Sequence, residues 1–309
     1  MKVLAIDGGQ GACRAAVYRH GRLAAKGTGG GYRHHRRGRL ASILEGPRQA
    51  IEALGEAARG VEVAALGLSG FSGDRALADA IAAHIRDLTG AARVLIANDA
   101  VTAHAGALQL QPGVVVAAGT GVIALAVADD GRWARADGRG YLLGDAGSGF
   151  AIGQAGLHSA LNLLDGRGGS PALLRRLEQR FGSVASLHDR VYGTDDAVAL
   201  IAGFAEEVAQ AAREGDEESR AIWRRAAQEL TRTALAAARR VFSDQPFTLS
   251  WNGRLLEAED LLLEPWLAAV RTGRAGARCL PPAGDQLAGA RLLGEAGPSI
   301  FADLVASYP

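Results

Sequence analysis

The sequence predicts a two-domain α/β protein. Short apolar runs alternate with stretches whose apolar residues recur at helical spacing. A strand-and-turn pattern near residue 3 returns near residue 113, which predicts two related domains. The chain has 309 residues, 48% of them hydrophobic, so it is long enough for two cores. We place the domains at 1–111 and 112–309.

The elements follow from apolar patterning in chain order. VLAI at 3–6 and ACRAAVY at 12–18 are strand-like, and a Gly-Arg turn at 21–22 leads into a third strand. The first half then predicts helices over 41–58, 75–89 and 100–109 and strands over 63–68 and 94–97. The second half predicts helices over 151–164, 171–181, 196–213, 217–241 and 285–295 and strands over 247–251 and 277–280.

The repeat is seen when the chain is shifted by 110 positions. VLAIDGGQGACRAAVYRHGRLA then lies on GVVVAAGTGVIALAVADDGRWA without a gap. Gly9 meets Gly119, Gly11 meets Gly121, and the Gly-Arg turn at 21–22 meets another at 131–132. Because the turns keep their register as well as the strands, we interpret the pattern as an internal duplication.

Composition excludes several classes of protein. The 42 glycines are about 14% of the chain, roughly twice the usual share, but they have no collagen-like period. A net charge of +1 gives no global electrostatic reason to bind nucleic acid or a membrane. Two distant cysteines, Cys13 and Cys279, exclude a disulfide scaffold and a four-thiolate zinc site. With no long apolar run and no signal-peptide profile, we expect a cytoplasmic protein.

Each repeat places a Gly-x-Gly turn between two strands. The first turn holds Gly8, Gly9 and Gly11 directly after Asp7, and the second holds Gly119, Thr120 and Gly121. A turn without large side chains lets phosphate oxygens approach backbone N–H groups. Two such hairpins facing one cleft would hold the phosphates of a nucleotide, whereas the structural alternative is a pair of tight turns with no ligand.

Other nucleotide-binding patterns fit less well. A P-loop needs Gly-Lys-Ser/Thr, and neither lysine of the chain stands in that setting. The stretch GTGVIA at 119–124 imitates a dinucleotide fingerprint, which must open a helix. Here it runs into Asp-Asp-Gly-Arg at 129–132, which is a hairpin signal.

Two further segments are candidates for substrate chemistry. Asn98 and Asp99 follow the strand at 94–97, and Asp99 is either a helix cap or the base for a hydroxyl attacking a phosphate. The glycine-rich stretch 138–156 contains Asp145 and precedes a helix. It can close over a substrate, or it is a simple turn with Asp145 as a cap.

The motifs together resemble the BadF/BadG/BcrA/BcrD-type ATPase family, which includes N-acetylglucosamine kinases. The resemblance rests on Asp7-Gly-Gly, Asn98-Asp99-Ala100, Gly119-Thr-Gly121 and GYLLGDAGSG at 140–149, and it extends to SWNGRLL at 250–256 and AGDQLAGARLLGEA at 283–296. It implies two duplicated ribonuclease H-like domains of the actin/hexokinase type with an interdomain cleft. It also implies ATP and Mg²⁺ as cofactors, a sugar substrate and a homodimer.

The resemblance assigns a role to each matching residue. Asp7 would hold the Mg²⁺–phosphate complex, largely through water. Asp99 would be the catalytic base. The phosphate hairpins would be Gly8, Gly9 and Gly11, and Gly119, Thr120 and Gly121. The sugar would meet Asn98, Asp99, Gly138, Gly140 and Asp145, and the adenosine would meet Asn252 and Gly253.

The chain also departs from the family pattern. Family members usually carry hydroxyl residues where this chain has Gly11 and Cys13. The sugar-side Gly-Gly-Trp-Gly is Asp-Gly-Arg-Gly at 137–140, and an expected asparagine is absent from 27–39. That loop is basic over 32–39, which either selects an acidic or phosphorylated substrate or forms a solvated surface.

From these observations we expect a kinase that phosphorylates a hydroxyl of an amino sugar such as N-acetylglucosamine or glucosamine. The alternatives are a regulatory or activator ATPase and a sugar-binding protein without kinase activity.

Overall fold

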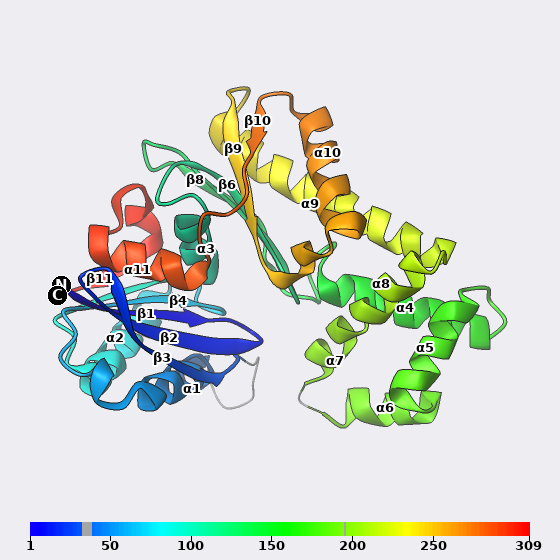
Figure 1. Ribbon diagram of the computed structural model, residues 1–309, viewed down its shortest axis with the longest axis horizontal. Helices are drawn as coiled ribbons and strands as arrows, with labels where there is room; N and C mark the ends of the chain where they lie inside the picture. The colour runs from blue at the N-terminus through cyan, green and yellow to red at the C-terminus, as the bar shows by residue number, and fades with distance from the viewer. Residues whose placement is uncertain (33–38, 195) are drawn as a thin grey trace.

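The computed structural model describes residues 1–32, 39–194 and 196–309, and it divides into two lobes, each built on one sheet (Figure 1). The first sheet has the strand order β11-β5-β4-β1-β2-β3, and the second has the order β10-β9-β6-β7-β8. The basic residues at 33–38, including the paired histidines at 34 and 35, lie outside the described residues.

The first sheet is covered on both faces. Its strands are β1 (Lys2–Gly8), β2 (Ala12–Arg19), β3 (Arg22–Gly30), β4 (Val63–Leu68), β5 (Arg93–Asn98) and β11 (Val305–Tyr308). Its helices are α1 (Arg39–Leu54), α2 (Arg75–Thr89), α3 (Asp99–Ala107) and α11 (Gln286–Ala296). Apolar residues of α1 and α2 form one core with Leu4 and Ile6 of β1. Because α3 and α11 pack on the other face, the buried middle strands are apolar throughout.

The second lobe is richer in helix. Its strands are β6 (Gly113–Ala118), β7 (Val122–Val127), β8 (Trp133–Asp137), β9 (Phe247–Asn252) and β10 (Ala277–Cys279). Its helices are α4 (Gly149–Leu164), α5 (Pro171–Phe181), α6 (Val184–Tyr192), α7 (Ala197–Gly203), α8 (Ala205–Arg213), α9 (Glu217–Phe242) and α10 (Glu264–Gly273). The long α9 lies against the sheet and carries a buried stripe from Ile222 to Val241.

The two sheets repeat one topology, which confirms the duplication predicted from the sequence. In each, three antiparallel strands are followed by two that add in parallel on the far side of the first. The loops of the hairpins differ, however. Residues 9–12 separate the paired Gly8 and Cys13, whereas residues 119–121 separate the paired Ala118 and Val122. The second hairpin is therefore one residue shorter, so the gapless superposition breaks at this loop.

The predicted elements agree with the structure best where apolar spacing is regular. The strand at 63–68 and the helices at 75–89 and 171–181 have the predicted bounds. The helix predicted over 196–213 is wrong in one respect, because it breaks at Phe204, whose fully buried ring packs against Gly156 of α4. Helices α6 and α10 and the short strand β11 are further elements that the apolar spacing did not reveal.

The end of the chain returns to the first lobe. Strand β11 pairs antiparallel with β5, and α11 packs on α3 and β1, so both chain ends lie at this lobe (Figure 1). Helices α3 and α11 cross closely, and the lack of a side chain on Gly289 allows this. A Cβ there would stand 1.8 Å from the carbonyl oxygen of Thr102. Residues 286–308 therefore pack with the first sheet although they belong to the predicted range 112–309. The boundary at 111 and 112 itself stays a prediction.

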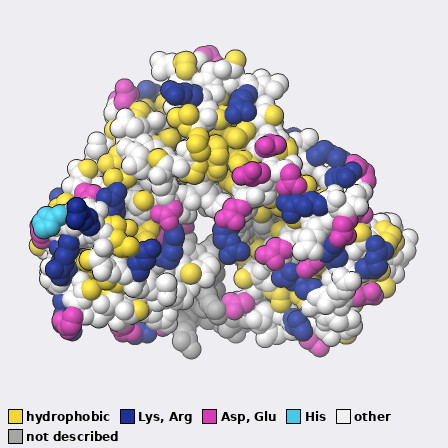
Figure 2. Space-filling view, viewed as in Figure 1, with side chains coloured by type: hydrophobic (Ala, Val, Ile, Leu, Met, Phe, Trp, Pro, Cys, Tyr) yellow, Lys and Arg dark blue, Asp and Glu magenta, His cyan; other side chains and the backbone are white. Residues whose placement is uncertain are grey.

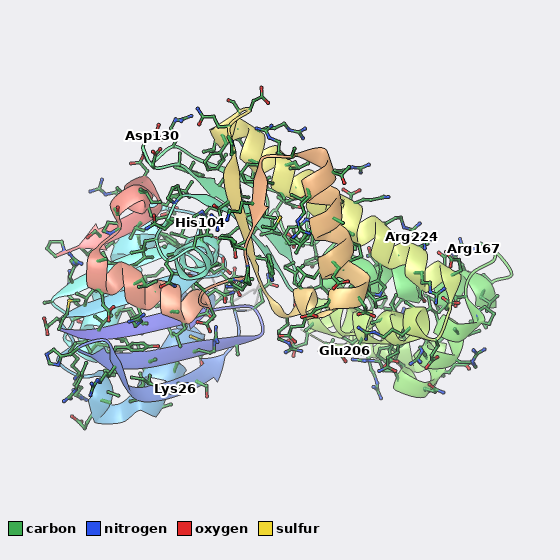
Figure 3. All side chains as sticks on the ribbon, turned by 45° about the horizontal axis from the view of Figure 1, so that its top comes forward. Lys26, His104, Asp130, Arg167, Glu206 and Arg224 are labelled. Carbon is green, nitrogen blue, oxygen red and sulfur yellow. The ribbon has the colours of Figure 1, made fainter. Side chains whose placement is uncertain are left out.

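Helix α3 connects the two sheets. Its His104 is fully buried where the lobes join, and its Nε2 lies 3.0 Å from the carbonyl oxygen of Gly113 at the start of β6 (Figure 3). Burial lowers the pKa of His104 to about 4, so the imidazole is neutral at pH 7 and Nε2–H donates to that oxygen. Away from this junction, the surface is hollowed between the lobes, with charged side chains of both signs along the rims (Figure 2).

Over the described ranges, no helix combines the length and apolar character that a membrane crossing requires.

Candidate active site

Asp7 occupies the end of β1, where its carboxylate is held by a guanidinium. Arg14, opposite it on β2, donates from Nε at 3.1 Å and from Nη2 at 2.6 Å to the same oxygen, Oδ2. The third donor of Arg14, Nη1, lies 2.7 Å from Oδ2 of Asp285. Among the described residues none donates a hydrogen bond to Oδ1 of Asp7.

The electrostatics of Asp7 are dominated by burial, which raises its pKa to about 6. Arg14 opposes this shift through its hydrogen bond and its charge, while the negative charges of Asp99 and Asp285 add to it. Asp7 and Asp99 lie at the ends of β1 and β5, which run parallel with β4 between them, so the two carboxylates lie at the same edge of the first sheet. A pair of carboxylates at one sheet edge can hold a divalent cation and accept a proton.

Asp99 stands where the sequence places it, directly after β5 at the start of α3. Ser69, at the end of β4, donates its hydroxyl hydrogen to Oδ2 of Asp99. Burial raises the pKa of Asp99, against the lowering effect of that hydrogen bond. The helix cap is Asn98, whose side-chain oxygen accepts from the N–H of Ala100 at 3.0 Å. Asn98 therefore performs the capping role, which leaves Asp99 for other chemistry.

The second hairpin is held by its own backbone. Within the turn, the N–H of Gly119 donates to the carbonyl oxygen of Gly121 at 2.9 Å. From the start of α4, the N–H of Gly149 donates to Gly119 at 2.8 Å and that of Phe150 to Thr120 at 3.2 Å. The turn carrying Thr120 is thus fixed against the start of α4, whose first two N–H groups are used by the turn itself.

Asp145 lies behind this turn. It is 5% exposed, and a Cβ on Gly121 would stand 2.6 Å from its Oδ2. Burial raises its pKa, while the backbone groups of Val122 and Gly140 act in the opposite direction. Its position is fixed by Asp137, whose carboxylate accepts from the N–H groups of Asp145 at 2.7 Å and of the next residue at 3.1 Å.

The remaining glycines of the site differ in the space around them. A Cβ on Gly8 would stand 2.8 Å from the side chain of Leu68, so its lack of a side chain is a packing requirement. Gly138 and Gly140 have φ of +67° and +82°, a conformation that favours glycine. These two glycines shape the stretch before Asp145.

The Asn252–Gly253 turn approaches the second hairpin from β9. Asn252 pairs with Ala117 of β6, and a Cβ on Gly253 would stand 2.2 Å from the carbonyl oxygen of Ala118. The Nδ2 of Asn252 is buried and has no hydrogen-bond partner among the described residues, so this turn contains an unsatisfied donor.

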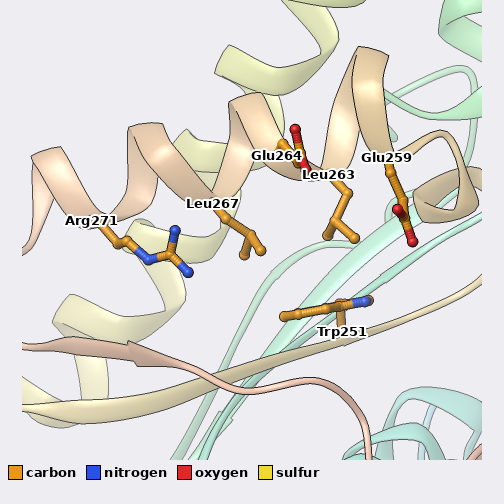
Figure 4. A pocket seen from close by; sticks show the side chains of 6 residues that line it. All are labelled: Trp251, Glu259, Leu263, Glu264, Leu267 and Arg271. Atoms are coloured by element: carbon orange, nitrogen blue, oxygen red, sulfur yellow. The ribbon is translucent and has the colours of Figure 1, made fainter.

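A pocket of about 430 Å³ lies beside this turn. Trp251 of β9 forms one wall, facing Leu263 and Leu267 on the helical segment above it (Figure 4). Glu259, Glu264 and Arg271 supply the polar part of the lining. An indole face with two leucines opposite can hold a flat heterocycle, and the charged groups can meet its polar edge.

The structure thus brings together Asp7, Asn98 and Asp99 in the first lobe. In the second lobe it gathers the Gly119–Gly121 turn, Asp145 and the Asn252–Gly253 turn. Within 1–32, 39–194 and 196–309, no hydrogen bond joins the first hairpin to the second.

Ser69, Arg14 and Asp285 were not identified from the sequence. The only signal for Ser69 was its place directly after a buried strand, and Asp285 had the signal of an ordinary helix cap.

Comparison with known proteins agrees with this arrangement. The model of the BadF/BadG/BcrA/BcrD ATPase family matches residues 4–268. The N-acetylmuramic acid/N-acetylglucosamine kinase of Clostridium acetobutylicum is 33% identical over 148 residues. That match spans about half of each protein, 47% of this chain and 48% of the relative.

Solved structures share the fold over nearly the whole chain. An inferred N-acetylglucosamine kinase of Chromobacterium violaceum has a TM-score of 0.76 and 28% identity, covering 94% of this chain and 98% of its own. A ROK family glucokinase of Streptomyces griseus, in complex with glucose and AMPPNP, has a TM-score of 0.56 and 18% identity, covering 96% and 100%. The two-domain actin/hexokinase fold predicted from the sequence is confirmed.

Proposed function

The chain belongs to the BadF/BadG/BcrA/BcrD ATPase family, and we propose that it is an ATP-dependent sugar kinase. It would transfer the γ-phosphoryl group of Mg·ATP to a hydroxyl of an amino sugar such as N-acetylglucosamine or glucosamine. The relatives from Clostridium acetobutylicum and Chromobacterium violaceum support this substrate class through their own described activities.

The observation that carries the proposal is the Ser69–Asp99 pair beside Asp7. Ser69 donates to Oδ2 of Asp99, and the other carboxylate oxygen would receive the sugar hydroxyl. The raised pKa strengthens Asp99 as a proton acceptor while the Ser69 hydrogen bond keeps the carboxylate form accessible. In this mechanism Asp99 takes the hydroxyl proton as the sugar oxygen attacks the γ-phosphorus, and ADP leaves.

The nucleotide would be held by the second lobe. Backbone N–H groups around Thr120, together with its hydroxyl, would contact the β- and γ-phosphates. Asn252 and Gly253 would lie against the adenosine, where the buried Nδ2 of Asn252 offers a hydrogen bond. The Trp251 pocket beside this turn would take the purine base.

Asp7 is the residue that would hold Mg²⁺, which prefers carboxylate oxygens and keeps several of its waters. The donor set fits, because Oδ1 of Asp7 is not used by the described protein groups and Asp99 adds a second negative charge nearby. A bound Mg²⁺ supplies charge neutralisation at the phosphates. Arg14 keeps the Asp7 carboxylate in place for this task.

On the sugar side, Asn98, Gly138, Gly140 and Asp145 remain predictions. The Nδ2 of Asn98 donates to the carbonyl oxygen of Phe71 at 2.9 Å, so its side chain is already engaged. Asp145 is turned toward Gly121, which favours support of the phosphate hairpin over direct contact with the sugar. The cytoplasm stays our expected location, and a homodimer our expected assembly.

The function is tested by measuring ADP release with Mg·ATP and a panel of N-acetylglucosamine, glucosamine, N-acetylmuramic acid and glucose. Strong stimulation by one amino sugar, with a phosphorylated sugar as product, is expected. Sugar-independent ADP release would instead identify a regulatory ATPase, and sugar binding without turnover would identify a binding protein. An activator that ligates a cluster through Cys13 is disfavoured, because that thiol is fully buried and burial raises its pKa to about 12.

A further inference from the structure

The geometry of Arg14 divides its donors between two carboxylates. Both bonds to Asp7 converge on Oδ2, and the third donor goes to Asp285. A guanidinium is a rigid fork that commonly pairs with both oxygens of one carboxylate. Here that arrangement is not adopted, and Oδ1 of Asp7 is left without a donor from the described residues.

Asp285 stands where the chain re-enters the first lobe. The chain arrives from β10 of the second sheet, and the N–H of Ala283 donates to the carbonyl oxygen of Ala107 at the end of α3. Asp285 then caps α11, with Oδ1 accepting from the N–H of Ala288 at 3.0 Å. Its other oxygen takes Arg14. One carboxylate therefore closes a helix and restrains a guanidinium at the same time.

We infer that Arg14 is a positioning residue for the metal-binding oxygen of Asp7, and that Asp285 holds Arg14 in the arrangement that leaves this oxygen free. With Nη1 bound to Asp285, the guanidinium is held in the orientation in which Nε and Nη2 both donate to Oδ2 of Asp7. Without Asp285 the guanidinium can shift, and a donor that reaches Oδ1 then competes with the cation for that oxygen. Asp285, which lies where the chain re-enters the first lobe, thus sets the metal affinity of the nucleotide site. This inference rests on the proposed function.

Asp285→Asn is the sharpest test, because asparagine also caps helices well and keeps an oxygen for Ala288. Its amide lacks the charge that attracts Arg14. Asp74→Asn is the matched control, since Asp74 caps α2 by accepting from the N–H of Leu77 at 2.9 Å and has no ion pair within the described ranges. Arg14→Lys is a second variant, which keeps the positive charge and removes the fork.

The measurement is the dissociation constant of Mn²⁺ from the complex with AMPPNP, followed by electron paramagnetic resonance of the free cation, with the chain in excess over AMPPNP because unbound nucleotide itself chelates Mn²⁺. We expect about a tenfold weaker Mn²⁺ affinity in Asp285→Asn and no change in Asp74→Asn. The KM for sugar at saturating metal should stay as in the wild type, because the defect is confined to the cation.

The outcomes separate the inference from the proposed function. A wild-type chain that binds no Mn²⁺ with AMPPNP overturns both. Wild-type binding with an unchanged constant in Asp285→Asn overturns the inference alone. If that variant does not fold, Arg14→Lys decides, since unchanged Mn²⁺ affinity there also overturns the inference.

Discussion

The two hairpins share one topology and a backbone hydrogen bond within the turn, from Gly9 to Ala12 in the first and from Gly119 to Gly121 in the second, but their neighbours differ. Beside the first, charged side chains meet, with Arg14 joining Asp7 to Asp285. In the second, backbone hydrogen bonds from the start of α4 hold the turn around Thr120. The duplication therefore preserved the strand order while the support behind each turn diverged.

The glycines that the shift of 110 positions matches in sequence also differ in their surroundings. A Cβ on Gly11 would have no neighbouring atom within 4 Å, whereas one on its counterpart Gly121 would be crowded by Asp145. A Cβ on Gly9 would meet the carbonyl oxygen of Ala12 at 3.3 Å, whereas its counterpart Gly119 is open. We therefore propose that Asp7 supplies carboxylate chemistry beside the first hairpin and that the second hairpin supplies backbone donors.

The largest effect is expected from removing the base beside the first hairpin. Asp99→Asn keeps the size of the side chain and loses its capacity to take a proton, so kcat should fall about 10²–10⁴-fold. Nucleotide affinity should stay unchanged if the second hairpin provides those contacts. Steady-state kinetics and AMPPNP titration measure the two quantities, with Asp87→Asn, exposed on α2, as the control. Turnover near the wild-type rate in Asp99→Asn would contradict the assignment of the base.

The crowding behind the second hairpin predicts the next effect. Gly121→Ala would push the new Cβ into Asp145 and displace the turn, and a misplacement of this kind costs about 10²-fold in kcat/KM for ATP. Gly121→Ala combined with Asp145→Ala is the matched comparison, because it removes the carboxylate that the new Cβ would meet. A double variant no more active than Gly121→Ala would show that crowding by Asp145 does not cause the loss.

The titratable carboxylate beside the first hairpin also predicts that Mn²⁺ binding depends on pH. The pKa of Asp7 is raised to about 6, so below that pH its protonation should weaken Mn²⁺ binding about tenfold per pH unit. Stability runs in the opposite direction. The folded state binds the Asp7 proton more tightly than the unfolded state does. The contribution of this proton to the free energy of unfolding is therefore present below about pH 4 and is lost as the pH rises through 6.

Measurements of Mn²⁺ affinity at pH 5, 6 and 7 test this dependence. The terminal phosphate of AMPPNP also titrates in this range, so Asp7→Asn, whose amide does not titrate, is measured at each pH as the reference. A Mn²⁺ affinity that is flat between pH 5 and 7 would contradict the raised pKa of Asp7.

Sequence reasoning predicted what depends on local spacing. Asp7 and Asp99 were found because they end buried strands, and the ends of parallel strands meet at one sheet edge. Arg14 was missed because it occurs in an apolar strand pattern and its partner Asp285 is 271 residues away. Such a pair depends on the path by which the chain returns to the first lobe, which apolar periodicity does not encode.

Asp145 illustrates a second limit. Its glycine-rich surroundings suggest an accessible loop, yet the N–H groups held by Asp137 turn its carboxylate inward. The repeat, in contrast, correctly predicted three successive strands with matching turns in each sheet, because these strands are conserved even where the loops change.

The smallest expected effect concerns the hydroxyl that the first hairpin lacks. Because Gly11 is exposed, surrounded by open space and free of a positive φ, a serine fits there without strain. Gly11→Ser would add one hydrogen bond to a phosphate oxygen, worth about 1 kcal/mol, and lower the KM for ATP about fivefold. Gly11→Ala is the control for the side chain without its hydroxyl. If the serine and alanine variants have the same KM for ATP, the backbone of the first hairpin already satisfies that phosphate oxygen. The two hairpins would then contact the nucleotide in a similar way, although different neighbouring groups hold them in place.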